Sequence, residues 1–235
     1  MKTLLKNQRW VATLAGSAAV LVFLLAAGAP RALADSISYN LTMPNSGLSG
    51  YTGPYAAVGV DLTSAITATI TFNSLTNGGY IYLMGDGGTA DLNVNGSYDL
   101  GPVTESNSIS GFGASYKDNS PGNVDGFGTF SLSLNNNGGF TDTATTISFT
   151  LTDTSGTWSS ASDVLLANAD GALAAVHAYA CADPGCSTAS GAATTGFAAN
   201  LGATEVSEPA TAMLLGVGLL ALVALDAYRR RKLAV

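Results

Sequence analysis

Ile66-Thr67-Ala68-Thr69-Ile70-Thr71-Phe72 is the stretch of sequence that decides the fold class. Apolar residues alternate in it with threonine, so an extended chain places an apolar row on one face and hydroxyl groups on the other. The same period of two recurs over 130–134, where Phe and Leu alternate with Ser, and over 147–151, where Ile, Phe and Leu alternate with Ser and Thr. These three stretches predict half-buried β-strands.

Weaker strand candidates lie on both sides of these three, over 36–42, 80–84, 89–95, 108–116, 172–180 and 195–199. Glycine-containing turns separate them, among them Asn77-Gly78-Gly79, Asp86-Gly87-Gly88 and Asn95-Gly96. Such turns favour hairpins, because glycine and asparagine tolerate positive φ. About nine short strands with this spacing predict an all-β fold, an antiparallel β-sandwich of jelly-roll or immunoglobulin-like build. A short helix is predicted over 160–168.

The first 34 residues have the three parts of a secretory signal peptide. Lys2, Lys6 and Arg9 form a basic start, an apolar stretch covers 11–29, and Ala32-Leu33-Ala34 supplies a small-x-small cleavage site. We therefore expect a mature chain that begins at Asp35. An uncleaved N-terminal membrane anchor is the alternative.

The last thirty residues contain an apolar span and then a basic cluster. Residues 210–228 would cover roughly 28 Å as an α-helix, close to the hydrocarbon thickness of a bilayer. Arg229, Arg230, Arg231 and Lys232 would hold that end in the cytoplasm. We expect an exported domain over 35–201, a linker with a sorting motif over 202–209, one transmembrane helix over 210–228 and a cytoplasmic tail over 229–235. A buried helix of a soluble core is the alternative.

Glu208-Pro209-Ala210-Thr211, the Leu/Gly-rich span and the terminal arginine cluster resemble the PEP-CTERM sorting signal of Gram-negative bacteria. The resemblance covers about residues 206–232, with Ser207 in the place of the family's leading proline and Asp226 interrupting the approach to the arginines. It implies that Ser207, Glu208 and Pro209 form a sorting motif for an exosortase. It further implies a protein held in the inner membrane until processing, in the setting of exopolysaccharide or biofilm.

The predicted exported part is strongly acidic. Between Asp35 and Glu208 it has twelve Asp and three Glu against one basic residue, Lys117, a formal charge of −14. Nucleic acid and anionic lipid surfaces repel such a charge, which excludes nucleic acid as a partner. Soluble display, cation binding and contact with neutral sugars remain. The length of this part suffices for one domain with its own core.

Cys181 and Cys186 are the two cysteines of the chain, and a Pro-Gly turn lies between them. In an exported chain this spacing predicts a small disulfide loop. A zinc site would need more ligands. His177, the single histidine, lies in an alanine-rich strand candidate, where a structural role is expected, and no Gly-x-Ser-x-Gly motif accompanies it. We expect no enzymatic activity, no metal and no cofactor; a glycosidase carboxylate pair stays the alternative.

Two further patterns are candidate binding sites. Residues 91–99 copy the first part of an EF-hand loop, but Pro102 stands where a bidentate Glu belongs, so a strand and hairpin is favoured and a calcium site using Asp86, Asp91 or Asp99 is the alternative. Four tyrosines are candidate sugar contacts, because an aromatic face stacks on a pyranose ring; core packing is their alternative. These are Tyr51, Tyr55, Tyr80 and Tyr82.

The sequence as a whole predicts a non-enzymatic cell-surface or extracellular-matrix protein, sorted by an exosortase and associated with exopolysaccharide or biofilm. Its partners would be the exosortase, the membrane and extracellular polysaccharide. The alternatives are a carbohydrate-binding module for matrix polysaccharide and a glycoside hydrolase.

Overall fold

Strand β4 (Thr67–Ser74) lies at the centre of a seven-stranded antiparallel sheet, as the alternation of its residues predicts. The computed structural model describes residues 35–106, 116–118, 120–136, 138, 142–183, 191–201 and 206–207. In this first sheet β4 pairs with β3 (Ala56–Ser64) and with β14 (Thr146–Asp153), and β3 pairs with β1 (Asp35–Leu41). The outer positions belong to β17 (Val206–Ser207) beside β1, and to β8 (Tyr98–Leu100) and β9 (Thr104–Ser106) beside β14.

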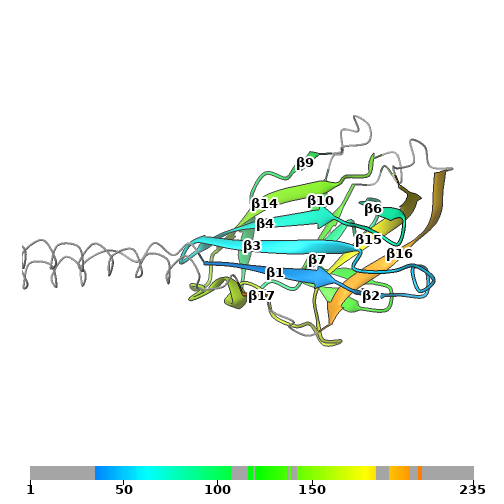
Figure 1. Cartoon of the computed structure of the whole chain (residues 1–235). Coiled ribbons are helices and arrows are strands. Elements are labelled where there is room, and N and C mark those ends of the chain that lie inside the picture. Colours follow the sequence, from blue (N-terminus) through cyan, green and yellow to red (C-terminus); the bar gives the residue numbers. More distant parts are fainter. Residues whose placement is uncertain are drawn as a thin grey trace, which may run out of the picture. The chain divides into compact units, whose positions relative to one another are not determined.

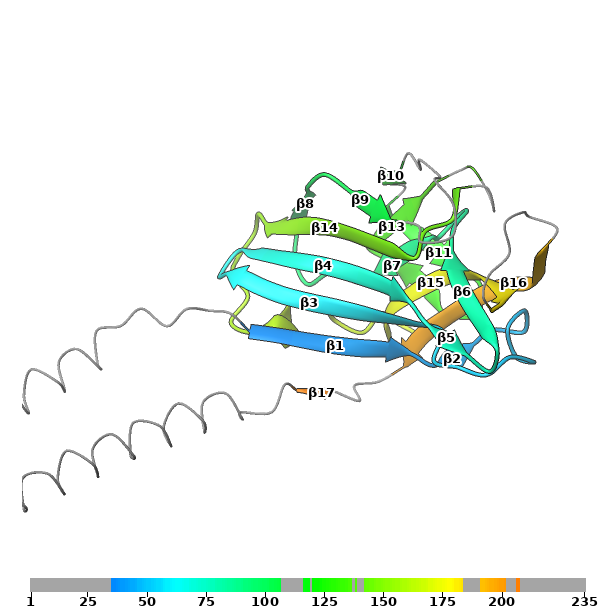
Figure 2. The ribbon, with the colours of Figure 1, turned by 45° about the horizontal axis from the view of Figure 1, so that its top comes forward.

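The second sheet has eight strands, with β15 (Ala172–Ala182) at its centre. On one side β15 pairs with β16 (Ala192–Leu201), and on the other with β6 (Tyr80–Met84) and β7 (Ala90–Leu92). Figures 1 and 2 show β7, β15 and β16 behind the strands of the first sheet. The remaining strands are β13 (Leu132–Asn135) beside β7, β10 (Lys117–Asp118) beside β13, β2 (Met43–Pro44) beside β16, and β5 (Thr76–Asn77) beside β6.

One hydrophobic core lies between the two sheets. The first sheet contributes Phe72, which stacks on Phe149 with ring centroids 6.3 Å apart, and the second contributes side chains such as Met84 and Val176. Trp158 is 1% exposed in the same core, and its indole N–H donates to the backbone oxygen of Asn95 at 3.0 Å. The prediction of an antiparallel all-β fold is therefore confirmed.

Most of the weaker strand candidates also form strands. Those over 36–42, 80–84, 172–180 and 195–199 correspond to β1, β6, β15 and β16, and the one over 89–95 shortens to β7. The candidate over 108–116 falls almost entirely outside the described residues. Strand β3 was not predicted, although Ala56, Val58, Val60 and Leu62 alternate along it and are all buried.

The predicted strand over 130–134 is divided in two. Strand β12 (Gly128–Phe130) ends before Ser131, where the chain bends, and β13 starts at Leu132. The Ser131 hydroxyl accepts a hydrogen bond from the Val94 N–H at 2.8 Å and contacts Leu92 O at 3.4 Å. This side chain therefore satisfies backbone groups of the neighbouring segment at the point where the strand is interrupted.

The helix predicted over 160–168 is wrong beyond its first turn. The structure has a 3₁₀-helix η2 (Ala161–Asp163), after which Leu165 forms an isolated bridge with Val94. The carboxylate of Asp35 accepts the N–H of Ala161 at 2.7 Å, so a residue from β1 satisfies a free donor at the start of η2. Among the described residues no helix has the length and apolar character that crossing a membrane requires. The predicted signal peptide and the span over 210–228 lie outside the described residues.

Candidate functional site

The predicted sorting segment begins in a strand. Ser207 pairs with Ile37 and Val206 with Ser38, so these two residues of the expected linker extend the first sheet beyond β1. This pairing covers β1, which would otherwise be the edge strand of the sheet. Glu208, Pro209 and the basic residues 229–232 lie outside the described residues.

Cys181 is disulfide-bonded. It lies on β15 and is fully buried beside Leu83, with Ile81, Tyr179 and Ala192 packed against the pair. Cys186, the other cysteine of the sequence, is outside the described residues.

The four tyrosines proposed as sugar contacts come together, but only two of them reach solvent. Tyr55 and Tyr82 are 1% and 0% exposed and pack edge to face with centroids 4.8 Å apart. Burial raises the pKa of Tyr82 to about 12, and its hydroxyl donates to Thr52 O at 2.8 Å. The prediction is therefore wrong for these two rings. Tyr51 and Tyr80 are half-buried and form a second edge-to-face pair at 4.9 Å, which offers no flat platform for a sugar.

The three acids of the calcium alternative do not meet. Asp91 is buried in β7 of the second sheet, whereas Asp99 lies on β8 of the first, opposite Thr152. Asp86 lies in the turn after β6 and is the one non-glycine residue with positive φ (69°) among those described. Among the residues that the structure describes, no three or more His, Cys, Asp or Glu side chains lie close enough together to hold a metal ion.

A polar and aromatic cluster occupies the face of the second sheet that points away from the core. His177 on β15 stacks on Phe197 of β16, with ring centroids 4.5 Å apart and planes 20° apart. Its Nε2 lies 2.7 Å from the hydroxyl of the exposed Thr195. The hydroxyl of Tyr179 donates to Asp86 Oδ2 at 3.3 Å. The sequence placed His177 alone in a strand; its cross-strand partners were not foreseen, because register is needed to find them.

This cluster lacks the geometry of a catalytic triad. The buried Nδ1 of His177 has no hydrogen-bond partner, and Asp86, the acid that acts on it electrostatically, is bonded to Tyr179 instead. Burial lowers the pKa of His177 and outweighs the opposing effect of Asp86, so the ring is neutral at pH 7. A neutral histidine without an orienting carboxylate can pack and accept or donate a hydrogen bond, which agrees with a structural role.

Asp91 is the most unusual titratable residue of the described chain. Its side chain is 0% exposed, and neither carboxylate oxygen has a hydrogen-bond partner. Burial raises the pKa of Asp91 to about 7, against a smaller lowering by the Ser133 hydroxyl. The oxygens of Asp91 and the Ser133 hydroxyl do not reach hydrogen-bond geometry, so desolvation dominates. A carboxyl in this state is protonated through most of the acidic range.

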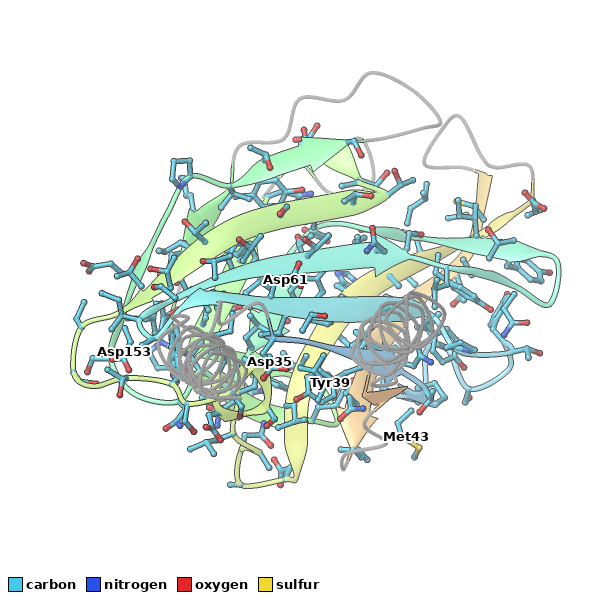
Figure 3. All side chains as sticks on the ribbon, turned by 60° about the vertical axis from the view of Figure 1, so that its left-hand side comes forward. Asp35, Tyr39, Met43, Asp61 and Asp153 are labelled. Carbon is cyan, nitrogen blue, oxygen red and sulfur yellow. The ribbon has the colours of Figure 1, made fainter. Side chains whose placement is uncertain are left out.

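Over β4 and β14 the solvent face of the first sheet carries uncharged polar side chains, most of them with hydroxyl groups. Along β4 the outward residues are Thr67, Thr69, Thr71 and Asn73, and they stand opposite Thr152, Thr150, Ser148 and Thr146 of β14. We call these eight residues the hydroxyl face; none is charged or aromatic. Cross-strand contacts fix the side chains, with Thr71 Oγ1 and Ser148 Oγ 3.2 Å apart and Thr146 donating to Asn73 at 3.2 Å. Figure 3 labels Asp61, which lies on the neighbouring strand β3.

Comparison of the chain with protein-family models, with curated proteins and with solved structures finds no match. The function is therefore argued from the residues and contacts described above.

Proposed function

We propose that the chain is an exported, non-enzymatic cell-surface or matrix protein of Gram-negative bacteria, a β-sandwich of jelly-roll or immunoglobulin-like build that an exosortase sorts through its C-terminal segment. The signal peptide over 1–34 directs export, and the span over 210–228 holds the chain in the inner membrane until the enzyme acts at Glu208-Pro209. The observation that supports the proposal most is the pairing of Ser207 with Ile37.

That pairing brings the two predicted processing boundaries together. Asp35, the expected first residue of the mature chain, is two residues from Ile37, and Glu208 follows Ser207 directly. Because β1 and β17 run antiparallel, the chain enters and leaves the domain at one end of the first sheet. Figure 3 labels Asp35 and Asp153 at this end. A domain with both connections at one end can be held at a membrane and then released without disturbing its strands.

Replacement of Glu208-Pro209 by Ala-Ala in a host with the exosortase tests the sorting role. We expect the variant to remain in the membrane fraction at its larger size, while the wild type leaves it at the mature size. The matched control is Asp183-Pro184 replaced by Ala-Ala, an acid–proline pair elsewhere in the exported domain, which should be processed normally. Normal release of the Glu208-Pro209 variant would refute the sorting role.

Binding of a neutral polysaccharide is a second candidate function, and the hydroxyl face favours it. Neighbouring strands are about 4.8 Å apart and alternate residues about 6.7 Å apart, so the eight side chains repeat with a fixed spacing in two directions. The eight residues are uncharged, and the acids beside them on the same face are Asp61 of β3, opposite Thr69, and Asp99 of β8, opposite Thr152. An uncharged strip of this kind suits a neutral partner. Thr and Ser lose little rotamer freedom on binding compared with long polar side chains. This face replaces the four tyrosines as the candidate sugar contact.

Affinity electrophoresis of the processed protein in gels with neutral and with acidic polysaccharides tests this second candidate. We expect retardation by a neutral polymer alone, and about tenfold weaker retardation when Thr69 and Thr150 are both changed to Lys, since the two lysines break several hydrogen bonds of about 1 kcal/mol or less each. Thr129→Lys, on an exposed position over the other sheet, is the control. Equal retardation of both lysine variants would exclude the hydroxyl face.

A further inference from the structure

A separate hairpin covers part of the outward face of the second sheet. Strands β11 (Gly122–Val124) and β12 (Gly128–Phe130) pair only with each other and form a two-stranded sheet of their own. We call residues Gly122–Phe130 the flap. Its apolar side chains form a small second core with three alanines of β15 and β16, and the members of this core are Val124, Phe127, Phe130, Ala172, Ala175 and Ala199.

Few polar contacts tie the flap to the rest of the domain. The side-chain amide of Asn168 donates to Phe127 O at 2.8 Å and to Thr129 O at 3.2 Å. The amide of Asn45 donates to Asp125 Oδ2 at 3.0 Å. No strand ladder joins the flap to either large sheet. The flap can therefore lift without breaking a sheet, at the cost of these contacts and of the second core.

Asp91 lies directly under one end of the flap. It stands between Ser133 of β13 and Ala175 of β15, and Ala175 belongs to the second core. A side chain at Gly122 of the flap would collide with Ser133 and come within 3.7 Å of Asp91 Oδ1. A side chain at Gly88 would come within 3.0 Å of Asp91 Oδ2. Two glycines thus let backbone close over the carboxyl on both sides.

The groups that face Asp91 offer no compensation for a negative charge. No charge is carried by Ser133, Ala175, Gly88 or Gly122. The nearest titratable group on the same face of β15 is His177, two residues along from Ala175. Burial lowers the pKa of His177. Two further neighbours are Phe197 of β16, whose ring a side chain at Gly88 would meet at 3.0 Å, and the acid Asp86, two residues before Gly88. An ionised Asp91 would be a buried, unpaired charge, which costs several kcal/mol unless water reaches it.

We propose that the flap is a pH-sensitive cover: it is seated while Asp91 is protonated, and it lifts when Asp91 ionises, because lifting admits water to the charge and uncovers the apolar surface beneath. This goes beyond the proposed sorting function and does not depend on it. The pKa of Asp91, about 7 when covered and 3.8 when freely exposed, gives the working range. The open population grows as the pH rises from about 4 to about 7 and is constant above that.

Hydrogen exchange of the full chain, measured by mass spectrometry and corrected for the intrinsic pH dependence, tests the proposal. Between pH 4 and pH 7.5 we expect the protection of flap amides over 122–130 to fall by about two to three orders of magnitude in the wild type, the factor that the two pKa values allow. Lifting exposes these amides because a two-stranded hairpin without its packing is only marginally stable. In Asp91→Asn the same amides should keep their protection. Amides of β4 and β14 should change little in either protein, and Asp99→Asn, an exposed acid on the first sheet, should behave as the wild type.

Three results would overturn the proposal. Flap protection in the wild type that is the same at pH 4 and pH 7.5 is the first, and it is decisive even if Asp91→Asn fails to fold. Equal pH dependence in Asp91→Asn is the second. Parallel loss of protection in β4 and β14 is the third, because it would indicate a general loss of stability. Asn168→Ala removes two attachments of the flap without touching Asp91, so it should raise flap exchange by a similar factor at both pH values.

Discussion

Replacement of Asp91 by Asn should remove most of the loss of stability that the domain suffers between pH 4 and pH 7. The unfolded chain ionises Asp91 with a pKa near 3.8, whereas burial raises the pKa in the folded domain to about 7. The folded state therefore binds more protons in this interval, and its stability is fully present below pH 3.8 and falls as the pH rises through 7. Asn keeps the shape of the side chain and does not titrate there.

The magnitude follows from the difference between the two pKa values. About three pKa units at 1.36 kcal/mol each correspond to about 4 kcal/mol, a large part of the stability of a typical domain. This is an upper limit for the wild type, since lifting the flap would relieve the buried charge. The measured loss should equal the smaller of two quantities, the cost of ionising Asp91 under the seated flap and the cost of lifting the flap.

Urea unfolding of the processed protein at several pH values measures this difference. Trp158 is buried in the core and is the one tryptophan after Asp35, so its fluorescence reports the unfolding of the domain. We expect the stability advantage of Asp91→Asn over the wild type to grow from pH 4 to pH 7 and then to stay constant, while Asp99→Asn follows the wild type. A difference between Asp91→Asn and the wild type that is independent of pH would refute the reasoning.

Three other variants or treatments have equally direct outcomes. Phe72→Ala, which empties a fully buried position against Phe149, should cost about 3–5 kcal/mol in urea unfolding, and a loss below 1 kcal/mol would contradict the core described here. Asp153 accepts the N–H groups of Ser155 and Gly156, which lower its pKa, so Asp153→Ala should destabilise the domain at pH 7. The effect should shrink as the pH falls through this lowered pKa, because the wild-type carboxylate then becomes protonated and loses its advantage; an effect that stays constant as the pH falls would exclude this role. A chelator should leave the melting temperature unchanged, and a fall of several degrees on chelation would restore the calcium alternative.

The strands that could be predicted are those whose pattern is carried by large side chains. In β4 and β14, Ile, Phe and Leu alternate with Thr or Ser, so the pattern is unambiguous. In β3 the same alternation includes the small residues Ala56 and Gly59 among the valines, so the difference in hydrophobicity between the two faces is smaller. The sequence pattern therefore did not predict this strand. Ser131 sits in a regular alternation, yet its hydroxyl takes over backbone hydrogen bonds and divides the strand, which no local pattern reveals.

The candidate site was less predictable, because it depends on residues far apart in the sequence. The sequence around Asp91 is compatible with a loop ligand or with an exposed strand residue. Asp91 is buried instead, because the flap, about thirty residues further along the chain, covers the outward face of the second sheet at this point. His177 meets Thr195 and Phe197 only through the register of β15 and β16. Tyr82 lies in a predicted strand and Tyr55 follows Gly53-Pro54 in a predicted loop, and both positions are typical of surface residues. Tertiary packing nevertheless buries both rings.

The most direct measurement for the proposed function is the terminal sequence of the mature protein, read by mass spectrometry from material released by a host with the exosortase. We predict an N-terminal peptide that begins at Asp35 and no peptide from the span over 210–228 or from the basic residues 229–232. Released protein that still carries Arg229-Arg230-Arg231-Lys232 would contradict sorting through the C-terminal segment.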